Sequence, residues 1–348
     1  MPDDVVLVTP RFAGLVRVAA MFTPGSFAFV MATGIVSIAA ASVGLGGIAR
    51  VLFAINLVAF PGLWLLLLVR LCRRPAGLLA DFADDRRGPG LLTIVAGTCV
   101  MGSQIALLTT DLALVPPLWI AAGLLWLGLI YGLFAAMTIR PEKLPLDDGL
   151  SGGWLLIVVA TEALAILGTH AARAWSLADP VLLISVGLFL IGSFFYLILL
   201  TLILYRWLFM PFAHQHFTPS YWINMGAAAI STLAGAKLLQ AIAADPVLAP
   251  VRDVLFTETL LLWALATWWI PLLILLTLWR HRTMPLGYRL ENWSIVFPLG
   301  MYTAASWAFA QEIGLPALTM VPRVFVWVAI AAWCATFTGM VRHFWRLR

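Results

Sequence analysis

Two charged side chains lie within apolar stretches of this sequence, where an unpaired charge is costly. Lys237 falls in the apolar stretch 221–243, and Glu162 falls near the middle of the stretch 152–171. A lysine at the centre of a membrane helix costs roughly 2.5 to 3.5 kcal/mol. Three arrangements would offset this cost: an ion pair with Glu162 or Glu258, attraction of an anionic substrate, or extension of the long side chain to the outer interface. The sequence leaves all three open.

Glu162 has two alternative roles. A lone carboxylate at that depth either pairs with another polar group or takes up a proton. As a buried partner of Lys237 or of hydroxyl groups it would be structural, and as a proton acceptor it could relay a proton in a coupled carrier. Glu258 and Glu312 lie near the ends of apolar stretches, so we expect them at the membrane interface.

The elements that must position these charges are long apolar helices. Of the 348 residues, 63% are hydrophobic and only 11% are charged, with a mean hydropathy of +1.00, whereas a soluble chain has about 25% charged residues. Because about 20 apolar residues cross a bilayer, we predict an all-α polytopic membrane protein, a single domain over 1–348 with a short N-terminal segment 1–21. The ten predicted transmembrane helices are 26–45, 51–71, 91–110, 116–138, 152–171, 179–205, 221–243, 254–279, 292–312 and 321–342.

The basic residues are distributed unequally among the connections. If the N-terminus is cytoplasmic, the outside segments hold only Arg50, Arg173, Arg252 and Arg323 of the 21 basic residues. Lys237 lies within a span, and the others fall inside. This asymmetry follows the positive-inside rule and predicts a multi-pass protein of the cell (plasma or inner) membrane with both termini cytoplasmic. Since topology explains the positive charge, nucleic acid is not expected as a partner.

Odd and even spans differ in composition. The even spans are rich in large apolar residues, whereas the odd spans contain small and polar residues, among them Thr33, Gly34, Gly97 and Gly168. Polar groups in a membrane are costly unless they face protein or water. We therefore predict five helical hairpins, with the odd helices inside around a central pore and the even helices against lipid. Alternatively, small residues only allow close helix packing, although packing alone does not predict Lys237 or Glu162.

Three segments resemble a known family. Residues 22–38 read FTPGSFAFVMATGIVSI, residues 220–235 read SYWINMGAAAISTLAG, and residues 297–300 read FPLG. The first is similar to the opening helix of the tellurite-resistance/dicarboxylate transporter (TDT) family, with Ala32 in place of a glycine. This family includes the bacterial TehA channel, plant slow anion channels, and fungal malate and sulfite transporters. Length, number of spans and alternation fit the family over nearly the whole chain.

The resemblance implies a bundle of five hairpins around an anion path, assembled as a homotrimer with one pore per protomer. It also implies that Phe297, on the ninth helix, plugs the pore at mid-membrane. Because Phe297 precedes Pro298, which removes a backbone donor, we expect a kink there. The alternative is that Phe297 packs against lipid or a neighbouring helix. The residues expected along the path are Thr33, Gly34, Gly97, Gly168, Lys237 and Gly300, and the glycines among them could equally be packing contacts.

The sequence therefore predicts a channel or transporter for small inorganic or organic anions, without a cofactor or a bound metal. The alternative within transport is a proton-coupled carrier of C4-dicarboxylates, or one that exports sulfite or tellurite. An intramembrane enzyme would need a Ser/His pair, an Asp/Asp pair or a metal cluster at membrane depth. We expect no histidine within the spans and no such pair, so catalysis is not expected.

Overall fold

The computed structural model describes residues 22–175, 178–243, 247–285 and 287–346. This part of the chain contains ten long helices. Each predicted span coincides with one of them, and every predicted boundary lies within five residues of the observed one. Two short helices, α4 (Pro75–Phe82) and α7 (Leu146–Gly149), lie in connections. The long helices are α2 (Ala28–Ser42), α3 (Gly46–Arg73), α5 (Leu92–Leu108), α6 (Val115–Ile139), α8 (Leu156–Ala174), α9 (Ala178–Phe209), α10 (Ile223–Ala241), α11 (Arg252–His281), α12 (Trp293–Glu312) and α13 (Met320–Arg346).

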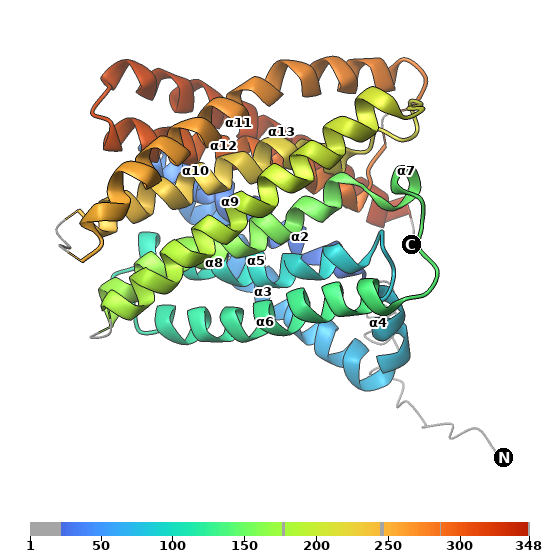
Figure 1. Ribbon diagram of the computed structural model, residues 1–348, viewed down its shortest axis with the longest axis horizontal. Coiled ribbons are helices and arrows are strands. Elements are labelled where there is room, and N and C mark those ends of the chain that lie inside the picture. Colours follow the sequence, from blue (N-terminus) through green and yellow to red (C-terminus); the bar gives the residue numbers. More distant parts are fainter. Residues whose placement is uncertain (1–21, 176–177, 244–246, 286, 347–348) are drawn as a thin grey trace.

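Consecutive long helices pack as five hairpins, which run alongside one another in Figure 1. The first members of the hairpins, α2, α5, α8, α10 and α12, contact one another in chain order, and α12 closes on α2. They form a ring of five helices, called the ring helices below. The second members, α3, α6, α9, α11 and α13, lie outside, each against its hairpin partner and the next ring helix.

Burial separates the two sets of helices in the way the sequence predicts. In the spans that contain α2, α5 and α8, 61%, 83% and 94% of the 18-residue apolar stretch is buried, against 11% to 50% for the outside helices. Leucines such as Leu65 and Leu68 on α3 are about half exposed, as expected for a surface that faces lipid. The protein is therefore a polytopic helical membrane protein.

Among the described residues, eight helices are long and apolar enough to cross a membrane by length and composition, and α10 and α12 are not among them. These two carry polar residues such as Asn224, Lys237 and Ser306, which lower their mean hydropathy. They contain 19 and 20 residues, about 28 to 30 Å of helix. Both helices belong to the ring, where other helices fully bury polar residues such as Asn224 and Ser306.

Small residues bring the two helices of a hairpin close together. A Cβ on Gly168 of α8 would lie 2.0 Å from Ser185 Oγ on α9, and one on Gly235 of α10 would lie 1.9 Å from Thr259 Oγ1 on α11. The hydroxyls of Ser185 and Thr259 donate to the carbonyl four residues earlier in their own helices, which satisfies them within the bilayer.

The five ring helices all begin at the same end of the bundle. We call this the inner end, after the side to which the sequence-based topology assigns the N-terminus, and the opposite one the outer end. Both limits of the described chain lie at the inner end. Phe22 packs in one cluster with Leu91, just before α5, and the ring of His343 on α13 lies 5.6 Å from that of Tyr288, in the connection before α12. A chain that crosses the membrane an even number of times begins and ends on the same side, as the two limits of the described chain do here.

Candidate functional site

Each ring helix starts with a 3-10 turn built from residues that favour tight or irregular backbone. The turns are η1 (Pro24–Phe27), η2 (Gly88–Leu91), η3 (Gly152–Leu155), η4 (Pro219–Trp222) and η6 (Leu290–Asn292). The turns η3 and η4 touch through backbone, since a Cβ on Gly152 would lie only 2.2 Å from the carbonyl oxygen of Ser220. Glycine is therefore the residue that lets these two helix starts meet.

The five helix starts surround an inner cavity of about 600 Å³. Its mouth carries the arginines Arg70, Arg86, Arg87 and Arg289 and the acids Asp81 and Glu291, and its deep end is apolar, with Met31, Leu156, Ile223 and Phe297. The first N–H groups of a helix have no partner within that helix and carry a partial positive charge. Five helix starts and four arginines therefore bias this cavity toward anions.

Asp81 balances part of this positive charge. Its carboxylate accepts from Arg70 Nη2 at 2.5 Å and from Arg87 Nη1 at 3.1 Å, and Asp81 itself is only 4% exposed. The Nη1 atom of Arg70 is buried without a hydrogen-bond partner among the described residues. Arg70 thus retains an unused donor beside the cavity.

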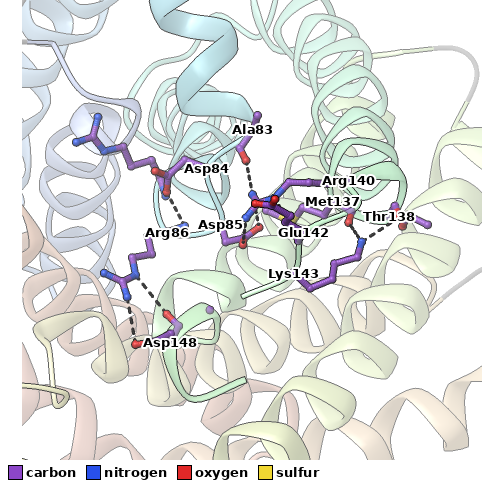
Figure 2. A network of polar contacts seen from close by, with 12 residues as sticks. Ala83, Asp84, Asp85, Arg86, Met137, Thr138, Arg140, Glu142, Lys143 and Asp148 are labelled. Atoms are coloured by element: carbon purple, nitrogen blue, oxygen red, sulfur yellow. Dashed lines mark hydrogen bonds and ion pairs between the residues drawn. The ribbon is translucent and has the colours of Figure 1, made fainter. Parts of the chain in front are cut away.

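A network of polar contacts joins the segment before α5 to the connection between α6 and α8, as Figure 2 shows, and its Arg86 also lines the inner cavity. Arg140 Nη2 lies 3.1 Å from Asp85 Oδ2, and its Nη1 donates to the carbonyl of Ala83 at 2.9 Å. Arg86 reaches Asp148 at 3.4 Å, while Asp84 accepts from the backbone N–H of Arg86 at 2.8 Å. In the sequence this acidic and basic stretch falls between the predicted spans 51–71 and 91–110. The structure shows a segment fixed to the connection between α6 and α8.

A second, outer cavity of about 70 Å³ lies within the same ring. Its walls are mostly apolar, and its polar side chains are Ser42, Ser103, His170, Lys237 and Trp307. Lys237 Nζ donates to Gln240 Oε1 at 3.4 Å. Among the described residues no acidic side chain lines this cavity.

The two cavities are stacked along the ring. On every ring helix, a residue of the inner cavity is followed seven residues later by one of the outer cavity: Met31 and Ile38, Thr93 and Val100, Leu156 and Ala163, Ile223 and Ile230, Phe297 and Ala304. Seven residues are two helical turns, about 10 Å. No described residue lines both cavities, so the two are separate in this conformation.

Phe297 lies at the boundary between the cavities. It lines the inner cavity and is 3% exposed, while Met301, one turn further along α12, lines the outer cavity. Pro298 follows it inside a continuous helix and sits against α10, where a Cβ on Gly226 would lie 2.8 Å from its ring. A bulky apolar ring therefore lies at the end of the inner cavity that is nearer the outer one, at the level of Met31, Leu156 and Ile223.

Comparison of the sequence with known protein families identifies the family of this chain. The sequence model of the voltage-dependent anion channel family (SLAC1) matches residues 21–341. The chain belongs to this family. It is accordingly an anion channel or transporter, and the family consists of transport proteins rather than enzymes.

Relatives of this anion channel family member occur in Methanocaldococcus jannaschii and Mycobacterium tuberculosis. Two uncharacterized transporters of Methanocaldococcus jannaschii are 23% and 24% identical to it, each over 90% of this chain and over 92% and 91% of their own lengths. An uncharacterized membrane protein of Mycobacterium tuberculosis is 34% identical over 152 residues, which are 43% of this chain and 77% of that protein.

The predicted path residues of this family member fall into two groups. Phe297 and Lys237 line the inner and the outer cavity respectively. The others pack between helices: Thr33 accepts from the indole of Trp333 on α13 at 3.0 Å, and a Cβ on Gly34, Gly97, Gly168 or Gly300 would meet Val100, Phe27, Ser185 or Ile35. These contacts correspond to the packing alternative for the glycines.

Glu162 and Lys237 are not brought together. Glu162 is fully buried, and a Cβ on Gly192 of α9 would lie 2.4 Å from its Oε1 atom, so the carboxyl group is directed at α9. Neither carboxyl oxygen has a hydrogen-bond partner among the described residues, and no ion pair there joins Lys237 to Glu162 or Glu258. Lys237 instead faces the outer cavity.

Sequence reasoning missed His170. The expectation that no histidine lies within the spans is wrong, because His170 belongs to α8 and already falls in the predicted span 152–171. The signal that singled out Lys237, a polar residue in an apolar stretch, would also have found it. The Asp81 ion pairs were missed as well, since Arg70 lies at the end of the predicted span 51–71 and Asp81, eleven residues later, falls in the connection after it.

Proposed function

We propose that this protein conducts small anions passively along the axis of the helix ring, and that Phe297 is its gate. The observation that carries the proposal is the pair of stacked cavities within the same five helices, with Phe297 at the end of the inner cavity nearer the outer one. Such an arrangement is a nearly continuous route with one closed section. The conformation described here would then be the closed channel.

The chemistry of the inner cavity supports anions as the permeant species. Arg70, Arg87 and Arg289 and the partial positive charge of five helix starts raise the local concentration of anions. Asp81 offsets only part of that charge. An anion that leaves the cavity toward the outer end then meets a short apolar section, which blocks conduction by excluding water.

The gate is tested by Phe297→Ala. We expect this substitution to raise anion conductance by about tenfold or more, equivalent to about 1.4 kcal/mol of the barrier, because the ring that separates the cavities is gone. Conductance is measured in planar bilayers and liposomes with chloride, nitrate, sulfite and malate.

Phe309→Ala is the matched control for this test. It removes the same ring from the same helix, but Phe309 packs against Phe256 and Trp263 and lines neither cavity. Its conductance should equal that of the wild type. An unchanged conductance of well-folded Phe297→Ala protein would reject the gate.

A second candidate function is a proton-coupled carrier of C4-dicarboxylates, or one that exports sulfite or tellurite. The observation that favours it is Glu162, a buried carboxyl group with no hydrogen-bond partner among the described residues. Its polar neighbours include the hydroxyls of Ser193 and Ser231 and the carboxyl group of Glu258. Such a group can bind and release a proton during a transport cycle.

We further propose the cell membrane as the location, with both termini in the cytoplasm, and a homotrimer as the assembly. The basic connections at the inner end support the orientation. The trimer rests on the family resemblance alone.

A further inference from the structure

Three polar side chains from three ring helices face the outer cavity. Ser103 belongs to α5, His170 to α8 and Lys237 to α10. Ser103 is 7% exposed, and neither its hydroxyl nor the ring of His170 makes a hydrogen bond within the described residues. Their hydrogen-bonding capacity is thus available to a molecule inside the cavity.

The lining has the character of an anion site. Lysine has three N–H donors and no acceptor, while serine and neutral histidine can each donate one hydrogen bond. Lys237 gives one long hydrogen bond to Gln240 at 3.4 Å, which leaves two donors. In the part of the chain that the structure describes, no Asp or Glu lines the cavity to neutralise this charge, and the apolar walls strengthen its electrostatic attraction.

The size of the cavity limits what it can hold. Its volume of about 70 Å³ exceeds what one water molecule needs but lies far below the 300 to 1,000 Å³ that is typical of small-molecule sites. The inner cavity, at about 600 Å³, falls within that range. A dicarboxylate could therefore occupy the inner cavity, whereas the outer one fits a single small ion.

We propose that Ser103, His170 and Lys237 form a binding site for one small monovalent anion, and that this site sets the size limit for permeation. The inference rests on the proposed function for its role in transport but not for binding. A single formal charge within apolar walls attracts the anion and still allows it to leave, as conduction requires.

Binding is tested with bromide as the probe. Crystals of the full-length protein soaked in bromide should show an anomalous difference peak in the outer cavity, within hydrogen-bond distance of Lys237 Nζ. The peak should be lost in Lys237→Met and weakened in Ser103→Ala. Lys143→Met is the matched control, because it removes the same charge from the inner connection between α6 and α7, and it should keep the peak. Absence of the peak from the wild type, or an undiminished peak in Lys237→Met, would overturn the site.

Transport provides the second readout. In liposomes, Lys237→Met should lower chloride flux by about tenfold, with Lys237→Arg close to the wild type. Succinate applied at the inner end should reduce chloride flux without crossing. The inference is overturned if Lys237→Met leaves the chloride flux at the wild-type level. It is also overturned if succinate crosses as fast as chloride. Absence of flux from the wild type and from Phe297→Ala, with the bromide peak present, would instead overturn the proposed function and support the binding site.

Discussion

Glu162 and Ala163 are neighbours in sequence but face different surroundings. Ala163 lines the outer cavity, while Glu162 is directed at α9, because successive residues of a helix are 100° apart. The sequence shows that Glu162 and Lys237 are charged residues in apolar spans, where an unpaired charge is costly. It does not show in which direction either side chain points. The ring helices are buried on nearly all sides, so their apolar residues form no stripe from which a face could be predicted.

Glu162→Gln separates the passive channel from the coupled carrier. Because Glu162 lines neither cavity, we expect the amide variant to keep passive chloride flux, within roughly twofold. We also expect a pH gradient to drive no accumulation in wild-type liposomes. Both are measured by anion uptake with and without the gradient, and Glu142→Gln, at an exposed position between α6 and α7, serves as the control. Gradient-driven uptake by the wild type that Glu162→Gln alone abolishes would establish the carrier instead.

Among the predicted path residues, residue type alone distinguishes a cavity-lining position from a packing position only for the charged Lys237. A lysine in a span has few explanations, and Lys237 does line a cavity. The four glycines were equally consistent with a path and with packing, because a missing side chain fits both, whereas Thr33 was predicted along the path and its hydroxyl instead contacts another helix. Their partners, such as Trp333 for Thr33, lie as far as 300 residues away in the sequence, and no local pattern identifies them.

At the scale of the element, length and composition predicted all ten long helices, since about 20 apolar residues have few alternatives. The odd and even alternation also predicted which helices form the ring. The inner 3-10 turns could not be predicted in this way. The composition of a segment such as Gly88-Pro89-Gly90 is typical of any surface loop. Its position beside the inner cavity depends on four other turns that are distant in sequence.

Gly152→Ala tests the contact between two of these turns. The added Cβ would lie 2.2 Å from the backbone oxygen of Ser220, and backbone cannot rotate away as a flexible side chain can. We expect a loss of about 1 to 3 kcal/mol in the free energy of unfolding, measured as a lower midpoint of thermal unfolding in detergent.

The control for this contact is Gly187→Ala on α9. A Cβ there would have no atom within 4 Å, and alanine has the higher helix propensity, so its midpoint should equal or exceed that of the wild type. Equal midpoints for the two variants would show that η3 and η4 can separate without cost.

At the scale of the whole molecule, the two ends of the ring differ in width and charge. The inner cavity is wide and carries arginines partly balanced by Asp81, whereas the outer cavity is narrow with one lysine. The sequence predicted the excess of positive charge at the inner end, because it follows from topology. It could not predict the two volumes, which depend on how five helices pack around the axis.

Orientation in the membrane follows from this asymmetry and can be tested with a native thiol. Cys72 is exposed on α3, two residues beyond Arg70 of the inner cavity. Cys99 is buried, and Cys334, although exposed, lies midway along α13, where we expect lipid. Since a membrane-impermeant maleimide reacts only with thiols that water reaches, Cys72 should be the thiol that reports the side.

We expect this maleimide to label the protein in inverted membrane vesicles and not in right-side-out vesicles, because the inner end should face the cytoplasm. Labelled protein is detected by its mass increase, and Cys72→Ser, which should abolish labelling, identifies the reacting residue. Labelling of Cys72 from the external face of sealed right-side-out vesicles would invert the topology. The arginine-rich cavity would then open to the outside, and anions would be gathered from the external solution rather than from the cytoplasm.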